Sequence, residues 1–330
     1  MGSFRVAITD FILDDLTPER GILDDLAEIV ACNVQNETEL VGRIENADAI
    51  MMYHCITLSR RTIERLTNCR VIVRCGVGYD NVDHVFARHR GIAVANVPDY
   101  GTEEVADSAI GMMLALARGI HRLNSRLRAG QGPWMYSQAS PVWRLRGRVF
   151  GVIGLGRIGT AVALRAKALG MDVVFYDPYK PDGYDKSLGI RRCETLEELL
   201  RQSFVVSIHC PRSAETTRMI GAAQLACMPR GSFLINTARG AIVDTAAIPS
   251  AIESGQLAGA GIDVLPIEPP STDDPLIQAW RDPTHPAHDR VIINPHAAFY
   301  SEEGLLDMRV KGAETCRRAL LGLPLRNVVN

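Results

Sequence analysis

Apolar residues along this chain recur in short runs, which are separated by segments with helical spacing. The first runs are "FRVAIT" at 4–9, "AIMMYHC" at 49–55 and "RVIVRC" at 70–75. Continuous apolar runs of this length are typical of strands that are buried on both faces, and the helical segments between them would form crossovers. The pattern therefore predicts an α/β fold whose parallel sheets are covered by helices.

A second series of apolar runs begins near residue 148, which predicts a second α/β domain. Its members are "RVFGVIG", "DVVFYD", "FVVSIHC", "SFLINT", "GAGIDV" and "VIIN". Apolar residues at helical spacing predict one long helix over 102–123, packed between domains or subunits. A last helix is predicted over 301–320, because acidic residues occupy its first turn and arginines its last. The stretch 269–289 is rich in Pro and Asp and predicts a surface loop.

Length and charge narrow the possible functions. The chain has 330 residues, of which 47% are hydrophobic, and this is too long for one ordinary core. A net charge of −2 gives no basic excess for binding nucleic acid. The opening "MGSFRVAITD" contains no signal peptide or membrane span. We therefore expect a cytoplasmic protein with no direct nucleic-acid or membrane partner.

The cysteines and histidines argue against a metal centre. Eight cysteines are scattered without a C-x-x-C pair, which disfavours zinc ribbons and thioredoxin-like chemistry. Reduced thiols in a cytosolic protein are the simpler interpretation. His285 and His288 lie in a polar stretch, but no matching group of ligands accompanies them. The sequence predicts no metal.

The stretch "GLGRIG" predicts a dinucleotide site. Gly154, Gly156 and Gly159 form G-x-G-x-x-G between an apolar strand and an amphipathic helix. Gly154 permits a tight turn, Gly156 lets a pyrophosphate approach the backbone, and Gly159 lets the helix pack on the strand. Arg157 and Ile158 begin the helix, where free N–H groups would face the phosphates.

An acidic residue at the end of the next strand indicates which dinucleotide binds. Asp177 follows Gly159 by 177 − 159 = 18 residues, close to the spacing of about 20 for the acid that binds the ribose hydroxyls. Its carboxylate would repel a 2′-phosphate, and Pro178 and Tyr179 follow it instead of an arginine. NAD(H) is therefore favoured, while the basic residue Lys180 leaves NADP open.

Three polar residues follow later strands of the same series. Arg239 comes after "FLINT", Glu268 after "GAGIDVLP" and His296 after "VIIN". Ligands of doubly wound sheets bind beyond the carboxyl ends of the strands, where all three residues would lie. Histidine is the usual acid–base residue near neutral pH, and arginine matches a carboxylate. The alternatives are a surface ion pair, a loop charge and an ordinary histidine at a strand end.

These motifs together resemble a known family. They are "RCGVGYDNVD", "NVPDYGTEEVADSA", the glycine motif, "NTARG", "IDVLPIEPP" and "NPHAA", spread over 74–320. The chain resembles the D-isomer-specific 2-hydroxyacid dehydrogenases. Within them it is most similar to the C-terminal binding protein branch, through "AVALRAKALGMDVVFYDPY" and "PHAAFYSEEGLLDMR".

The resemblance implies a reaction in which NADH reduces a small 2-keto acid to a 2-hydroxy acid. His296 would donate the proton to the carbonyl oxygen, and accept it in the reverse direction. Glu268 would hold the imidazole and favour its protonated form. Arg239 would bind the substrate carboxylate and polarise the ketone. The implied activity is that of an NAD-dependent oxidoreductase.

The resemblance also implies further contacts to cofactor and substrate. Cys210 and Pro211 would line the adenosine side, and Thr237 and Ala238 would also contact the cofactor. Asp263 would lie near the nicotinamide carboxamide; the alternative is that it caps the following turn. The remaining implied substrate contacts are the backbone N–H groups of Val77 and Gly78, and the ring of Phe299.

The family's domain layout carries over as an expectation. A Rossmann-type NAD-binding domain over 101–298 would be inserted into a discontinuous, flavodoxin-like substrate domain formed by 1–100 and 299–330. The hinges would lie near Tyr100 and Phe299, and closure would expel water from the hydride path. The chain would form a homodimer through the coenzyme domain, with the helix 102–123 in the interface.

Other functions stay open on the sequence alone. An NAD(H)-sensing corepressor-like binding protein with weak dehydrogenase activity would keep the same three polar residues. The animal corepressors, however, carry a tryptophan where this chain has Phe299, and they have a long tail beyond the end of this chain. Formate dehydrogenases carry Gln where this chain has Glu268, and phosphoglycerate dehydrogenases usually have a regulatory C-terminal domain. The pattern does not specify which 2-hydroxy acid is the substrate.

Overall fold

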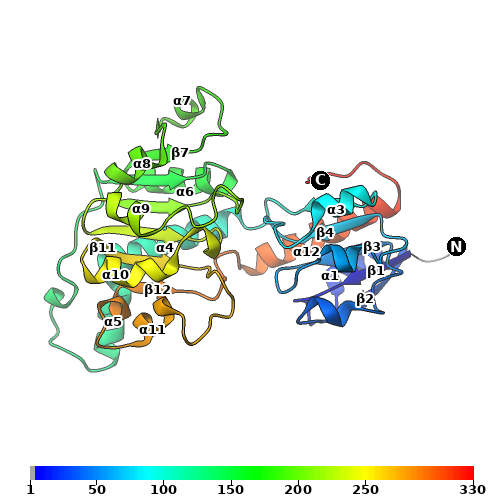
Figure 1. Ribbon diagram of the computed structural model, residues 1–330, viewed down its shortest axis with the longest axis horizontal. Helices are drawn as coiled ribbons and strands as arrows, with labels where there is room; N and C mark the ends of the chain where they lie inside the picture. The colour runs from blue at the N-terminus through cyan, green and yellow to red at the C-terminus, as the bar shows by residue number, and fades with distance from the viewer. Residues whose placement is uncertain (1–3) are drawn as a thin grey trace. The chain divides into compact units, whose positions relative to one another are not determined.

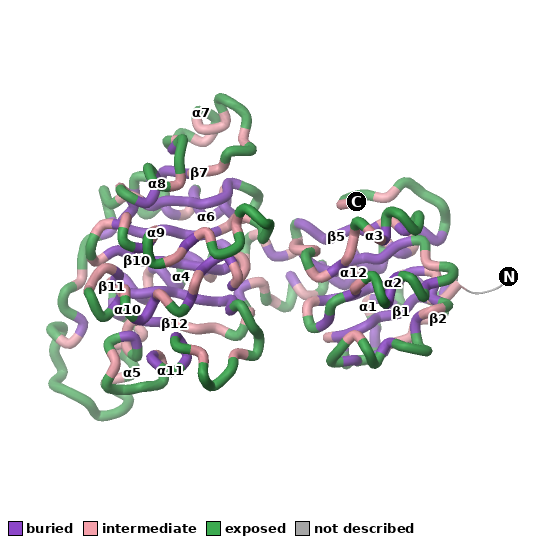
Figure 2. The backbone as a smooth tube through the Cα atoms, viewed as in Figure 1, coloured by how far each residue is buried: buried purple, intermediate pink, exposed green. Residues whose placement is uncertain are grey.

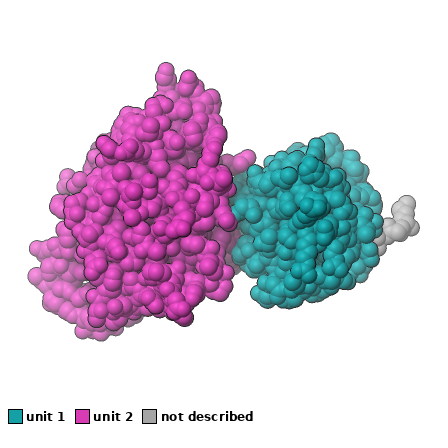
Figure 3. Space-filling model, in the orientation of Figure 1, with its two compact units in different colours: residues 1–101, 301–330 teal, residues 102–300 magenta. Residues whose placement is uncertain are grey.

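The computed structural model describes residues 4–330, and the chain divides into two compact units (Figure 3). Unit 1 combines Met1–Gly101 with Ser301–Asn330, and unit 2 is Thr102–Tyr300. Each unit has its own sheet with helices packed on it (Figure 1), and every strand pair is parallel. The predicted class, two doubly wound α/β domains, is confirmed.

Unit 1 contains a five-stranded sheet in the order β2-β1-β3-β4-β5. This is the flavodoxin-like order, in which the chain reverses direction across the sheet between β1 and β3. Figure 2 shows the central strands of this sheet buried, which explains the uninterrupted apolar run of β3. The strands are β1 (Phe4–Ile8), β2 (Ala27–Ala31), β3 (Ala49–Met52), β4 (Val71–Arg74) and β5 (Ala93–Asn96). The helices are α1 (Thr17–Leu23), η1 (Glu37–Leu40), α2 (Arg60–Ile63), α3 (His84–His89) and α12 (Glu302–Leu320).

The last helix of the chain, α12, completes unit 1. Its predicted start is confirmed, because Ser301 caps it by accepting a hydrogen bond from the N–H of Gly304 at 2.8 Å. The helix packs against α1, β3 and β4. At Gly312 the approach is so close that a Cβ would lie 2.7 Å from the Cys75 sulfur, so a larger residue would push the helix off the sheet.

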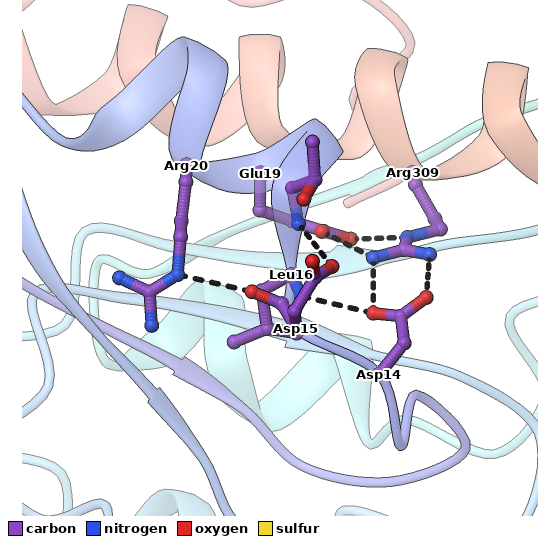
Figure 4. A network of polar contacts seen from close by, with 7 residues as sticks. Asp14, Asp15, Leu16, Glu19, Arg20 and Arg309 are labelled. Atoms are coloured by element: carbon purple, nitrogen blue, oxygen red, sulfur yellow. Dashed lines mark hydrogen bonds and ion pairs between the residues drawn. The ribbon is translucent and has the colours of Figure 1, made fainter.

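A buried ion group fastens α12 to the start of the chain (Figure 4). Arg309 on α12 donates from Nε and Nη2 to the two carboxylate oxygens of Glu19, both at 2.7 Å, and also binds Asp14. Glu19 is fully buried and Arg309 is 5% exposed. Burial lowers the pKa of Arg309, but the hydrogen bonds to Glu19 and Asp14 outweigh burial and raise it. This guanidinium therefore stays charged inside unit 1.

Unit 2 contains a seven-stranded sheet in the order β12-β11-β10-β9-β6-β7-β8. This is the Rossmann order, which reverses between β6 and β9. Its strands are β6 (Val149–Ile153), β7 (Asp172–Tyr176), β8 (Arg191–Arg192), β9 (Val205–Ile208), β10 (Ser232–Asn236), β11 (Leu257–Ile262) and β12 (Val291–Ile293). Its α-helices are α4 (Thr102–Arg118), α5 (Ile120–Arg128), α6 (Arg157–Ala168), α7 (Tyr184–Leu188), α8 (Leu196–Gln202), α9 (Ala222–Cys227), α10 (Ile248–Glu253) and α11 (Pro275–Arg281). Its short 3₁₀ turns are η2 (Tyr136–Ala139), η3 (Gly240–Ile242), η4 (Thr245–Ala247) and η5 (Pro286–Asp289).

The expectation of one helix over 102–123 is wrong, because α4 ends at Arg118 and α5 begins at Ile120. Gly119 separates them with φ 65°, a left-handed conformation that favours glycine. A Cβ at Gly119 would lie 2.8 Å from the Cβ of Ala139. Helical spacing of apolar residues does not reveal such a break, since a single glycine is also tolerated inside a helix.

The apolar face of α4 is covered within unit 2. The helix packs on α6, β10 and β11. Glycines in β11 allow this approach, because a Cβ at Gly261 would lie 2.9 Å from the Cβ of Met112. The apolar residues that suggested packing between subunits therefore serve the core of this unit.

The predicted surface loop over 269–289 is wrong in part, since it contains α11 and η5. Asp274 caps α11 by accepting hydrogen bonds from the N–H groups of Leu276 and Ile277, and Pro275 occupies the first turn. Leu276 and Ile277 are buried, so an apolar face holds the helix in place. This face is short and lies among prolines and acidic residues, so its pattern was not recognised in the sequence. In the part of the chain that the structure describes, no helix is long and apolar enough to cross a bilayer.

Candidate active site

His296 lies in a tight turn just beyond β12. Its φ is 53°, a left-handed conformation uncommon for a residue with a side chain. The turn is held from the end of β11 by Asp263, whose carbonyl accepts from the His296 N–H at 2.8 Å. The Asp263 carboxylate accepts from the N–H groups of Ala297 and Ala298 at 2.9 and 3.1 Å. On the other side, Ser108 Oγ of α4 donates to the Ala298 carbonyl at 3.2 Å, so the histidine turn is fixed from two elements.

The side chains of His296 and Glu268 meet directly. The distance between His296 Nδ1 and Glu268 Oε2 is 2.7 Å. The other carboxylate oxygen of Glu268 accepts from the N–H of Leu265 at 2.7 Å, which fixes the acid in place. The side chains of His296 and Glu268 are 25% and 35% exposed, so the pair is accessible to a ligand. A carboxylate at Nδ1 favours a proton on that nitrogen and orients the ring.

Asp263 adds a third ionisable group to this cluster. It is 2% exposed, and burial raises its pKa, although the N–H groups of Ala298 and Ala297 and the nearby His296 lower it. Both oxygens of its carboxylate are engaged by the histidine turn. Asp263 therefore caps a turn, but it is the His296 turn beyond β12 and not the turn that directly follows Asp263 in the sequence.

Arg239 follows β10 in a turn that a buried asparagine shapes. Asn236 accepts from the N–H of Ala238 at 3.1 Å and donates to the carbonyl of Arg239 at 3.0 Å. The next residue, Gly240, touches the segment that leads to Glu268, since a Cβ there would lie 1.9 Å from the carbonyl carbon of Leu265. Sequence reasoning missed Asn236 and Gly240 as positioning residues, although both belong to the stretch "NTARG".

Arg239, Glu268 and His296 follow three adjacent strands, β10, β11 and β12. Their turns are joined by direct contacts: the Gly240 approach to Leu265, and the Glu268–His296 hydrogen bond. The structure therefore brings these three predicted residues together at one edge of the sheet. Phe299 belongs to the same group, since its ring lies 6.3 Å from the His296 ring, centroid to centroid.

In the glycine turn after β6, protein packing explains why Gly154 and Gly159 lack a side chain, but it does not explain Gly156. A Cβ at Gly154, where φ is 85°, would lie 2.5 Å from the Cys210 nitrogen, and one at Gly159 would lie 2.1 Å from the Gly154 oxygen. A Cβ at Gly156 would meet no protein atom within 4 Å. Gly156 is also the N-cap of α6, so its lack of a side chain fits the close approach of a phosphate.

Asp177 lies beyond β7 and is bound to the glycine turn. Its Oδ2 accepts from the Leu155 N–H at 2.8 Å, and its Oδ1 accepts from the Tyr179 N–H at 3.0 Å. Each carboxylate oxygen can accept a second hydrogen bond, so Asp177 can still bind ribose hydroxyls. The tie to Leu155 was not foreseen from the sequence.

The residues expected along the cofactor follow β9 and β10, two adjacent strands of the sheet, and β9 adjoins the point where the strand order reverses. Cys210 and Pro211 follow β9, and Thr237 and Ala238 follow β10. Thr237 is 8% exposed, and its hydroxyl is buried without a hydrogen-bond partner among residues 4–330. A buried polar group without a partner is costly, so a ligand that binds the hydroxyl fits this position.

Two further predictions concern other parts of the chain. Val77 and Gly78 lie in unit 1, beyond β4, and the Val77 carbonyl accepts from Asn96 Nδ2 at 2.7 Å. His209 follows β9, where burial lowers its pKa to about 3 and Ser207 Oγ lies 2.7 Å from its Nε2. A neutral, buried histidine of this kind fits a structural role.

Comparison with known proteins identifies the family. The model of the family "D-isomer specific 2-hydroxyacid dehydrogenase, NAD binding domain" matches residues 110–298. D-3-phosphoglycerate dehydrogenase of Methanocaldococcus jannaschii is 33% identical over 99% of this chain, and that of Archaeoglobus fulgidus is 37% identical over 88%. This chain spans only 59% and 53% of the length of these two relatives.

A solved structure leads to the same family. D-lactate dehydrogenase from Aquifex aeolicus, in complex with NAD and lactic acid, superposes with a TM-score of 0.85 at 28% identity and 96% coverage of both chains. The family model covers more than half of the present chain. The chain therefore belongs to the D-isomer-specific 2-hydroxyacid dehydrogenase family, with an NAD-binding Rossmann domain in unit 2.

Proposed function

We propose that the protein is an NAD-dependent dehydrogenase that interconverts a small D-2-hydroxy acid and the corresponding 2-keto acid. The observation that carries the proposal is the 2.7 Å contact between His296 Nδ1 and Glu268, in a partly exposed pair whose Glu268 segment adjoins the turn of Arg239. An acid–base group and a permanent positive charge are the two features that reduction of a keto acid requires from the protein.

Each polar residue has a distinct task in this reaction. When bound, the nicotinamide cofactor supplies or accepts the hydride at the carbon that carries the oxygen. Arg239 binds the substrate carboxylate and stabilises negative charge that develops on the carbonyl oxygen. His296 gives its proton to that oxygen in reduction and removes it in oxidation. Glu268 orients the imidazole and stabilises its positive charge.

The backbone around these residues supports precise placement. Asp263 holds the histidine turn, and Asn236 holds the arginine turn. The proposed binding residues for NADH are the glycine turn, Asp177, and the group that follows β9 and β10: Cys210, Pro211, Thr237, Ala238. A role for Asp263 beside the nicotinamide carboxamide would add to its capping role.

We assign coenzyme binding to unit 2 and substrate binding in part to unit 1. The family model lies within unit 2, which supports the first assignment. In unit 1, the N–H groups of Val77 and Gly78 would bind the substrate carboxylate, and the Asn96 side chain holds the Val77 carbonyl. Phe299, beside His296, would contact the substrate side chain.

We further propose that the chain is a homodimer through unit 2, with residues 102–123 and the exposed apolar residues that follow them in the interface. Trp134, Met135 and Tyr136 are 86%, 55% and 84% exposed, and Ile120 of α5 is 57% exposed. Clusters of exposed apolar side chains mark protein–protein contacts. A Trp134→Glu substitution should shift the mass in solution, measured by light scattering, toward the monomer; an unchanged dimer would move the interface elsewhere.

The experiment that tests the proposed activity is a screen of 2-keto acids with NADH, followed by the loss of NADH absorbance. Pyruvate, glyoxylate, hydroxypyruvate, its phosphate ester and a thioether keto acid cover short, polar, phosphorylated and apolar side chains. We expect turnover with at least one. If NADH binds and no keto acid is reduced, the dehydrogenase proposal is wrong, and the NAD(H)-sensing binding protein becomes the better account.

A further inference from the structure

The turns after β7 and β9 meet across the strand that lies between them. In the sheet, β6 pairs with β7 on one side and with β9 on the other. Tyr179, beyond β7, donates from its hydroxyl to Glu215 Oε2, in the turn beyond β9, at 2.5 Å. Because β6 separates the two strands, this contact crosses in front of its carboxyl end, where the glycine turn lies. The Glu215 carboxylate is thus placed beside the proposed dinucleotide site.

Local hydrogen bonds hold the turn that carries Glu215. Thr216 Oγ1 donates to the Pro211 carbonyl at 2.7 Å and accepts from the Ser213 N–H at 2.8 Å. The N–H of Thr217 donates to the Ser213 carbonyl at 3.0 Å. The turn therefore has a defined shape of its own, and it presents the glutamate to solvent on the side of Tyr179.

Tyr179 links this glutamate to the proposed ribose-binding acid. Its backbone N–H donates to Asp177 Oδ1 at 3.0 Å, while its hydroxyl binds Glu215. The hydrogen bond to Glu215 raises the pKa of the Tyr179 hydroxyl, so the phenol remains a donor at neutral pH. One residue thus connects two carboxylates at the same end of the dinucleotide site.

Two nearby basic residues are engaged elsewhere. Lys180 Nζ lies 4.7 Å from the centre of the Tyr184 ring, over its face. Arg192 lies 3.6 Å from Asp182 and 3.8 Å from Glu194. Arg212 lies in the same segment as Glu215. A cofactor phosphate at this end would therefore face the carboxylates of Asp177 and Glu215, while Lys180 and Arg192 are engaged by other groups.

We propose that Glu215, held in place by Tyr179, is a second carboxylate beside Asp177 that selects NADH against NADPH. The proposal rests on the proposed function, since it assumes that the adenosine ribose lies at Asp177. The 2′-phosphate of NADPH would then be repelled by both acids, whereas the ribose hydroxyl of NADH has no charge to repel.

The test compares the dissociation constants of NADH and NADPH, measured by fluorescence of the bound nicotinamide, without any substrate. Glu215→Gln should tighten NADPH binding about three- to tenfold and change NADH binding less than about twofold, as expected for a partly screened surface charge. The gain in NADPH affinity should be smaller at 0.5 M salt than at 0.05 M salt, because the Debye length, the distance over which charges interact, shortens as salt rises. Tyr179→Phe should change the ratio in the same direction by less, since the glutamate keeps its charge but loses its anchor.

Two variants control the comparison. Glu253→Gln removes an exposed carboxylate at the end of α10 and should leave both constants unchanged. Asp177→Ala should also relax the preference for NADH. If Asp177→Ala relaxes it and Glu215→Gln does not, the role of Glu215 is wrong while the proposed function stands. If the gain in NADPH affinity of Glu215→Gln were equal at low and high salt, the cause would be a changed shape of the site and not the lost charge, and the proposal would also be overturned. Failure of the unaltered protein to bind NADH would overturn both.

Discussion

Two charged groups in this protein join distant parts of the chain, and they differ in what surrounds them. Arg309 and Glu19 in unit 1 are 5% and 0% exposed, and the residues are 290 apart in sequence. His296 and Glu268 in unit 2 have side chains that are 25% and 35% exposed. The first pair has a guanidinium that keeps its proton, while the second has an imidazole, the side chain that most often acts as an acid or base in catalysis.

This difference indicates which pair stabilises the fold and which one acts on a ligand. A buried ion pair is held by the high cost of leaving either partner unpaired. A partly exposed histidine–carboxylate pair contributes little to stability, but its proton can be exchanged with a substrate. The substitutions below should therefore separate stability from turnover.

The largest effect is expected at the exposed pair. His296→Ala removes the proposed proton donor, and turnover should fall by roughly 10²–10⁴, the usual size of acid–base catalysis. NADH affinity and unfolding should change little, because the pair is not buried. Steady-state kinetics with the best keto acid and NADH fluorescence measure these quantities. His89→Ala, an exposed histidine at the end of α3, is the control. Unchanged turnover in His296→Ala would remove the histidine from the mechanism.

The buried pair should show the opposite behaviour. Arg309→Met leaves the Glu19 carboxylate buried without a partner, which should lower the free energy of unfolding by about 3–5 kcal/mol. Urea unfolding followed by circular dichroism measures this loss. The matched control is Arg317→Met on the same helix, whose partner Asp25 is 66% exposed, and there the loss should be much smaller because solvent screens an exposed pair. Equal losses in the two variants would show that burial of Glu19 does not set the cost.

A smaller loss of turnover is expected when only the negative charge of Glu268 is removed. Glu268→Gln keeps an oxygen that can accept from His296 Nδ1 but loses the negative charge. A hydrogen bond to a charged group is worth about 1.5–3 kcal/mol, which corresponds to a rate loss of about ten- to a hundredfold. A loss as large as that of His296→Ala would mean that the acid takes part in the reaction directly.

The smallest effect concerns acid stability of unit 1. The hydrogen bond from Arg309 lowers the pKa of Asp14, whereas burial raises it slightly, and the net shift is downward. The carboxylate is therefore ionised more readily in the folded chain than in the unfolded one. The stability that Asp14 contributes is complete above its pKa in the unfolded chain, about 3.9, and is lost as the pH falls through its lower pKa in the folded chain.

The side chain of Asp14 is 53% exposed, so solvent screening keeps the contribution to about 1 kcal/mol or less. Urea unfolding of the unaltered protein and of Asp14→Asn, at several values between pH 3 and 6, measures it. The difference between the two proteins should be largest at pH 6 and should shrink toward pH 3. A difference that grows on acidification would contradict this sign.

Most of the strands, the fold class and the types of residue at the site follow from local signals in the sequence. Apolar runs bounded by turn residues are a local signal, so β1, β3, β4 and six strands of unit 2 were expected close to where they occur. The glycine turn and Asp177 could also be predicted, because their spacing within a single strand–helix–strand unit follows from backbone geometry.

How residues far apart in the chain are used depends on the tertiary structure. The break at Gly119 depends on Ala139, which a helical pattern does not contain. The Asp263 carboxylate accepts from the N–H of Ala297, 34 residues further along the chain, in the turn that carries His296. The Arg309–Glu19 pair and the Tyr179–Glu215 contact depend on which strands are neighbours in a sheet. Local periodicity carries no information on such neighbours, because it records which face of an element is buried but not what covers it.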